Sequence, residues 1–337
     1  MATAIHPFNK LQLGIESTKG TIVPATRVIQ CDGALREVTE RYRSARPQGV
    51  RATAGGAGTT LMHATSLEVE TEATAEEILW PLLTGVKGGV TGTGAGNAKT
   101  WLFTPEITTG VLTLDAATLE YLMGDGVTNH YYGESGYGLT SSFKLGWAFN
   151  QISTLGWTMF ARRRQTGTPT SSLVVYTSRE PLVSNLLALY LDTTWAGLGG
   201  TPVLTIVRSA EFECTTGIEA DFTLDARSDL DHTGFKASSI GAKLALVLEF
   251  NATGTTVFAN YRANDVVYIR LKNTGSAIAG GGNKTIQIDG AYRFVEDPTF
   301  AADGDQMLMS ASLEAVYDAT GTKILEFTAI NTLTAVA

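Results

Sequence analysis

Histidine is the side chain that most often ligates zinc or moves protons near neutral pH. The chain has four, and they lie far apart in the sequence, at His6, His63, His130 and His232. None has a second histidine, a cysteine or a glutamate at metal-ligand spacing on an expected helix. The two cysteines, Cys31 and Cys214, have no CxxC or CxxH partner either. We therefore expect no metal and no cofactor, and we interpret both cysteines as small buried thiols, with a disulfide between two separate domains as the less favoured alternative.

Acidic residues concentrate in residues 225–232, which read DARSDLDH. Carboxylates this close together could hold calcium, with Asp225, Asp229 and Asp231 as ligands beside His232. An EF-hand loop also needs a central glycine and a distal glutamate, and both are missing here. The segment is therefore interpreted as a solvated loop.

Two glycine-rich segments resemble catalytic or phosphate-binding loops only in part. Residues 133–138 (GESGYG) have Tyr137 where a nucleophile elbow requires glycine. Residues 92–100 (GTGAGNAKT) lack the Gly-Lys-Thr sequence of a phosphate loop, because Ala98 precedes Lys99. The three consecutive arginines at 162–164 favour a solvated strand end over an anion site. With no catalytic constellation, we expect the protein not to be an enzyme.

Length and charge narrow the class of protein further. The 337 residues are 44% hydrophobic and 17% charged, with 36 glycines, which is typical of a globular chain with many short strands and turns. Residues 1–165 hold 14 basic and 14 acidic residues, whereas residues 166–337 hold 11 and 19, so the net charge of −8 lies in the second half. An acidic surface disfavours gripping nucleic acid, but it does not disfavour a wall past which DNA must slide without sticking. We expect neither a signal peptide nor a membrane-spanning segment.

Strand patterns dominate the chain. Near the C-terminus, residues 266–272, 284–294 and 306–318 alternate; Val267, Ile269 and Leu271, for example, share one face. A period of two predicts half-buried antiparallel strands. One helix is expected to begin near Thr74, since Glu77 follows at capping-box spacing, and to end at Gly85.

The second half of the chain repeats the order of elements in the first half. Each half has a strand, a short helical piece and then three or four strands. The strands at 100–104, 110–123 and 140–150 match those at 266–272, 284–294 and 306–318. This order predicts a mainly β fold of two tandem β-sandwich or barrel domains, each with one short helix. The predicted boundaries are an N-terminal arm at 1–26, a first domain at 27–165, a linker at 166–172 and a second domain at 173–337.

Five segments together resemble the tail tube proteins of long-tailed bacteriophages. Three lie near the C-terminus: YIRLKNTGSAI (268–278), IQIDGAYRF (286–294) and ADGDQMLMSASLEAVYD (302–318). The other two are GIESTKGTIVPATRVI (14–29) and WLFTPEITTGVLTLDAATLEY (101–121). Their order and spacing carry the resemblance, which covers most of the chain.

The resemblance implies a structural virion protein, assembled in the host bacterial cytoplasm, whose stacked rings form a hollow tube. Inner sheets would join around a lumen that holds the tape measure protein and then passes double-stranded DNA without specific binding. Tail terminator and tail-tip proteins would cap the tube. Because tail tubes resemble six-fold stacks of single domains, two tube domains per chain imply a trimeric ring with pseudo-six-fold symmetry. If the second half is instead a decorating domain outside the tube, six chains complete the ring.

The resemblance also suggests site residues. A long loop that reaches the neighbouring ring would include Arg43, Arg46, Arg51 and Thr60. Outward-alternating carboxylates that could line the lumen and repel phosphate are Glu68, Glu70 and Asp289. The alternative is a β-rich carbohydrate-binding or adhesin module, or another virion decoration protein.

Overall fold

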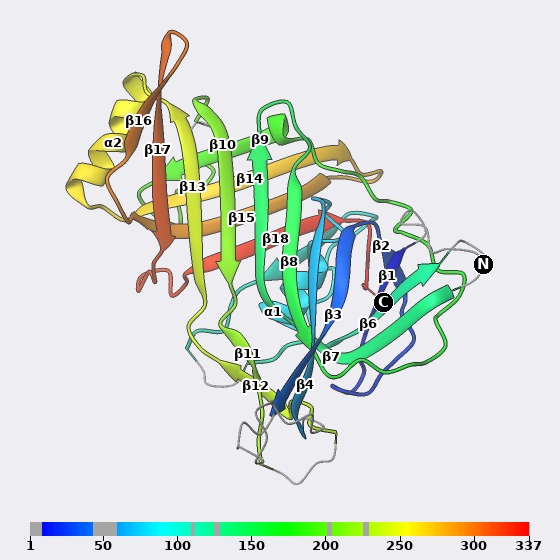
Figure 1. Cartoon of the computed structure of the whole chain (residues 1–337). Helices are drawn as coiled ribbons and strands as arrows, with labels where there is room; N and C mark the ends of the chain where they lie inside the picture. The colour runs from blue at the N-terminus through cyan, green and yellow to red at the C-terminus, as the bar shows by residue number, and fades with distance from the viewer. Residues whose placement is uncertain are drawn as a thin grey trace, which may run out of the picture.

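The chain folds into layers of antiparallel strands, shown as a computed structural model in Figure 1. The structure describes residues 9–42, 59–108, 112–124, 129–200, 204–224 and 229–336. Among these, 16 strands join into one sheet, and β11 (Ile218–Asp221) and β12 (Gly234–Ala237) form a separate hairpin. The predicted mainly β class is confirmed.

The front layer is a broad sheet whose strands run nearly vertically in Figure 1. From one edge to the other it contains β3 (Asp32–Tyr42), β4 (Thr59–Glu72), β8 (Thr154–Ala161), the second half of β7 (Asn129–Ala148), β10 (Val207–Thr215), β13 (Gly241–Glu249), β17 (Gln306–Ala315) and β16 (Thr299–Asp303). All of these neighbours are antiparallel.

Two groups of strands lie behind or beside this layer and cross its direction (Figure 1). One group contains β2 (Arg27–Ile29), β1 (Lys10–Ile15), β6 (Ala117–Gly124) and the first half of β7. The other contains β9 (Leu187–Asp192), β14 (Val267–Ala277), β15 (Asn283–Phe294), β18 (Leu325–Asn331) and β5 (Lys99–Phe103).

The long strand β7 belongs to both layers because it bends in the middle. Its first half pairs with β6, and its second half lies between β8 and β10. The bend lies at Gly136–Gly138, where Tyr137 has a φ of 60°. A Cβ on Gly138 would lie 2.7 Å from the Ala117 carbonyl oxygen, so only glycine allows this close approach.

The helices are short and lie at matching points of the two halves. Helix α1 (Leu79–Gly85) is entirely buried and begins later than predicted, with Ile78 as its N-cap residue and no side-chain cap. The predicted hydrogen bond is present in the turn before the helix, where the Thr74 hydroxyl accepts the Glu77 N–H at 3.0 Å. Helix α2 (Ala252–Ala263) is capped by Asn251, and the 3-10 helix η2 (Ser184–Leu186) precedes β9. In the described residues, neither α-helix is long and apolar enough to cross a membrane.

One hydrophobic core connects the two halves of the chain. Phe143 of β7, Phe212 of β10 and Phe327 of β18 pack together with ring centroids 5.6–6.1 Å apart. Strand β5, from the first half of the sequence, pairs with β18 from the end of the chain. Because the sheet and core are continuous here, the division at residues 166–172 stays a prediction.

The sequence predicts which strand of the first half corresponds to which strand of the second half, and this predicted correspondence is wrong by one strand. Strand β7 pairs with β6 behind and β8 in front, just as β15 pairs with β14 behind and β17 in front. The counterparts are therefore β6 with β14, β7 with β15 and β16, and β8 with β17. The sequence pattern predicts residues 100–104, which form β5, as the first strand of the repeat. In the structure β5 has no counterpart in this correspondence and instead pairs with β18.

Buried ion pairs fasten the start of α1 to the second half of the chain. Glu76 and Glu77 are both 0% exposed. Glu77 accepts a hydrogen bond from Arg179 Nε at 3.0 Å, and Lys284 of β15 lies 3.4 Å from Glu76. Burial raises the pKa of both carboxyl groups, and the neighbouring cations oppose that rise. The contacts therefore join parts of the chain that are distant in sequence, although desolvation offsets part of their attraction.

Removing the arginine should leave the Glu77 carboxylate buried without its counter-charge. We predict that Arg179→Met lowers the free energy of unfolding by roughly 3 kcal/mol. Adding Glu77→Gln should recover part of the loss, since it removes the orphaned charge. Urea denaturation measures both effects. The exposed Lys243→Met variant is the matched control, and an equal loss there would contradict the prediction.

The raised pKa of Glu76 also fixes a direction of pH dependence. A carboxyl whose folded pKa lies above its unfolded value binds more protons in the folded state, so its contribution to stability rises as the pH falls from neutral through the folded pKa. The stability of the native chain relative to Glu76→Gln should therefore increase on mild acidification. Thermal unfolding of both proteins between about pH 7 and pH 5 measures this difference. If the stability of the native chain minus that of Glu76→Gln stays constant or decreases on acidification, the pKa of Glu76 is not raised.

Candidate functional site

The open face of the front sheet is polar where strands such as β4 and β10 alternate between buried and exposed residues. In β4, Leu67 and Val69 are buried while Glu68 and Glu70 are exposed. In β10, Phe212 is buried while Glu211 and Glu213 are exposed. Apolar side chains therefore point between the layers, and carboxylates cover the solvent face.

Charges of alternating sign form a row across this face. Direct cross-strand neighbours, in order, are Glu70, Gly156, Lys144, Glu213, Lys243 and Glu314. Opposite charges on adjacent strands attract, whereas like charges directly opposite each other destabilise a sheet. This row therefore lets an acidic face form without the repulsion of neighbouring carboxylates.

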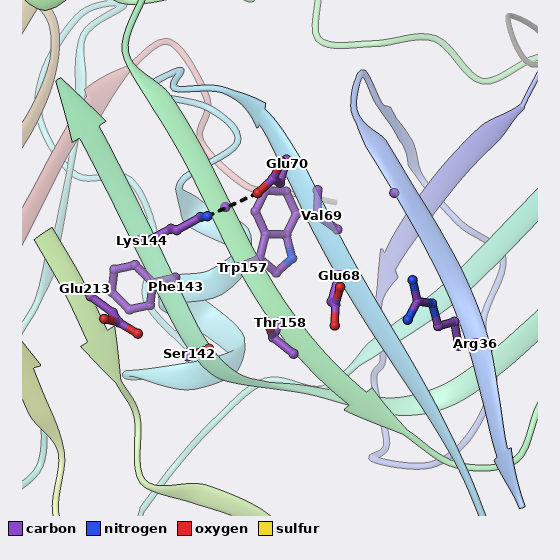
Figure 2. Close-up of a pocket in the computed structure, with 12 residues that line it drawn as sticks. Arg36, Glu68, Val69, Glu70, Ser142, Phe143, Lys144, Trp157, Thr158 and Glu213 are labelled. Carbon is purple, nitrogen blue, oxygen red and sulfur yellow. Dashed lines mark hydrogen bonds and ion pairs between the residues drawn. The ribbon is translucent and has the colours of Figure 1, made fainter. Parts of the chain in front are cut away.

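Gly156 allows one ion pair in the row to skip a strand. Lys144 Nζ lies 3.1 Å from Glu70 Oε1, although β8 separates the strands that carry them (Figure 2). A Cβ on Gly156 would lie 2.8 Å from Lys144 Cε, so the lysine crosses the space that the glycine leaves open. The two side chains are 55% and 72% exposed, so this pair contributes little to stability.

A shallow hollow of about 560 Å³ lies on the same face, between β3 and β10. Figure 2 shows its charged lining residues, which are Arg36, Glu68, Glu70, Lys144 and Glu213. The charges lie in the open and face solvent. Such a surface can repel or guide a charged polymer, and the described residues that line it include no buried acid, base or nucleophile of the kind that catalysis uses.

Two of the three predicted lumen-facing carboxylates lie on this face. Glu68 and Glu70 are both exposed there. The prediction that Asp289 faces outward is wrong, because it is 2% exposed and lies in the back layer. Arg270 of β14, its direct cross-strand neighbour, donates to both carboxylate oxygens at 2.7 and 2.8 Å. Asp289 therefore stabilises the pairing of β14 with β15.

Most of the predicted stacking loop lies outside the described residues, including Arg43, Arg46 and Arg51. Thr60 is half-buried near the start of β4 and pairs with Arg41 of β3. The hairpin formed by these two strands extends downward in Figure 1, beside the β11–β12 hairpin. The assignment of the loop stays a prediction.

Residues 225–228, including Asp225, lie outside the described residues, and the interpretation of 225–232 as a solvated loop is wrong for its last part. His232 is 0% exposed and lies among the rings of Tyr137, Phe160 and Phe222, with centroids 5.0–6.1 Å away. The carboxylate of Asp231 accepts the Arg163 N–H at 2.8 Å. These partners are distant in sequence and follow no local pattern, so sequence reasoning had no signal for them.

The described part of the chain contains no group of three or more His, Cys, Asp or Glu side chains that could hold a metal ion. Comparisons with known proteins add no assignment: no protein-family model matches the sequence, and no curated protein matches it. The candidate site therefore rests on the geometry of the front sheet.

The different environments of the predicted carboxylates lead to different effects of mutation. We predict that Asp289→Asn lowers the free energy of unfolding by about 2 kcal/mol, because it weakens a charge-assisted pair that is largely buried. Glu70→Gln should change it by less than about 1 kcal/mol, since that pair is exposed to water. Chemical denaturation of the two variants measures the contrast. Equal losses would contradict the division into a structural and a surface carboxylate.

Proposed function

We propose that the protein is a self-assembling structural subunit of a phage tail tube, with the front sheet as the wall of its lumen. The observation that supports this most directly is the form of that sheet. One face is polar and open, the other covers the core, and in the described residues β3 pairs with β4 alone and β16 with β17 alone. The sheet therefore ends in an unpaired strand on each side.

Unpaired edge strands are a hazard for a protein that stays monomeric, because they offer backbone groups to other chains. Joining copies edge to edge around an axis removes both edges, as closure does in a β-barrel. In such a ring the polar face would line the lumen. Glu68, Glu70 and Glu213 would then repel the phosphates of passing DNA, and no specific contact would hold it.

The repeated strand order favours two tube domains per chain. The front half-sheets β3–β4–β8–β7 and β10–β13–β17–β16 have the same order of corresponding strands. Each is connected to a corresponding strand of the back layers, β6 for the first and β14 for the second. Three chains would then complete a pseudo-six-fold ring in the virion tail. The tape measure protein would fill the lumen before ejection, and the terminator and tail-tip proteins would cap the ends.

Electron microscopy of the concentrated, purified protein tests this proposal. We expect rings or hollow tubes with a regular axial repeat, and end-on class averages that show three chains per ring. Tail-tip complexes should be added in a parallel sample to supply a nucleus for growth. A monomer that persists with tail tips and tape measure protein present would overturn the proposal and favour a carbohydrate-binding or adhesin module.

A further inference from the structure

The contact between β7 and β10 inside the chain offers a template for the contact between chains. It joins the last strand of the first half-sheet to the first strand of the second. By the strand correspondence, β10 is the counterpart of β3, and β7 is the counterpart of β15 and β16. The equivalent of the β7–β10 contact would pair β16 with β3, and the described chain lacks this pairing. Strands β16 and β3 are the two unpaired edges of the front sheet.

The equivalence of the two half-sheets can be fixed residue by residue. The β4–β8 ladder ends in a hydrogen bond from Ala73 N–H to the Ser153 carbonyl, and the β13–β17 ladder ends in one from Phe250 N–H to the Met307 carbonyl. Aligning Ala73 with Phe250 places Leu67 of β4 in the position of Leu244 of β13. Their cross-strand neighbours, Leu35 and Phe212, are then equivalent.

The same alignment identifies the equivalent of β7 at the other edge. Leu145 of β7 lies opposite Leu155 of β8, and Phe300 of β16 lies opposite Met309 of β17. Leu155 and Met309 are equivalent under the hydrogen bonds that end the ladders, so Leu145 and Phe300 are equivalent too. Inside the chain, Leu145 lies opposite Phe212.

We infer that β16 of one chain pairs antiparallel with β3 of the next, with Phe300 opposite Leu35 and Thr299 opposite Arg36. This inference rests on the proposed function and specifies its seam. The faces agree: Leu35 is buried on the core side, and Phe300 packs against Phe250 with ring centroids 4.9 Å apart.

Phe300 is less covered than its equivalent inside the chain. It is 45% exposed, whereas its internal equivalent Leu145 is 0% exposed. All five residues of β16 are exposed, although the strand forms a regular ladder with β17. A neighbouring β3 would cover Phe300 and satisfy the outer backbone groups of β16.

Cysteine cross-linking between two chains tests the register. One chain carries Arg36→Cys and the other Thr299→Cys, and Cys31 is replaced by serine in both. After the chains are mixed, assembled and oxidised, we expect a covalent dimer on a non-reducing gel, because directly opposite residues lie within disulfide reach. The matched control replaces Arg36→Cys by Glu40→Cys, which moves the thiol about 13 Å along β3 and should abolish the dimer.

The outcomes separate the seam from the function. Rings or tubes with the dimer only in the 36–299 mixture support the seam. Rings or tubes with no dimer, or with the dimer only in the control mixture, overturn the seam and leave the tube function standing. Absence of any assembly with tail tips present overturns both.

A second variant tests the seam without cross-linking. Phe300→Asp should abolish sedimentable assemblies, because it places a charge where the seam buries a ring. Phe149→Asp is the control, since Phe149 is also exposed, at 62%, but lies beyond β7, outside the seam. Normal assembly of Phe300→Asp, or equal loss in both variants, would contradict the inferred seam.

Discussion

The pairing of β7 with β10 is the constraint on which the rest of the structure depends. It joins two half-sheets that would otherwise each expose an edge strand, and it runs from Ser142 opposite Thr215 to Ala148 opposite Ser209. The rings of Phe143 and Phe212 seal it from behind, together with Phe327 of the back layer. Ladder hydrogen bonds and aromatic packing therefore act at one place, where the two halves of the chain meet.

The orientation of the front sheet follows from the bend in β7. The first half of β7 pairs with β6 and its second half with β8, and the close approach of Gly138 to Ala117 allows the strand to change layers. Once β7 has turned, the period of two places every second side chain of its neighbours on the core side. The other side chains form the polar face. On that face Gly156 leaves the space through which the Lys144 side chain reaches across β8.

Alternation and local hydrogen-bonding patterns made the strands, the Thr74–Glu77 hydrogen bond and the exposed positions of Glu68 and Glu70 predictable from the sequence. The start of α1 at Leu79 was not predictable in this way. Strand partners were not predictable in the same way, because a period of two reports which face is buried but not which strand lies alongside. Strand β5 pairs with β18 and is not part of the repeat, so the predicted repeat is displaced by one strand. Asp289 alternates like a surface residue, yet β14 supplies Arg270 as its partner and the back layer buries it.

The repeated strand order also bears on the energetics of the proposed ring. In a ring of such chains, half of the seams lie within a chain and form as it folds, without loss of translational or rotational freedom. Only the seams between β16 and β3 carry that cost, which association otherwise imposes at every contact. A covalent pair of half-sheets therefore halves the number of intermolecular seams to be closed. This explains how β16 could remain short and exposed, with Phe300 as its main apolar contact, while β7 is long and buried.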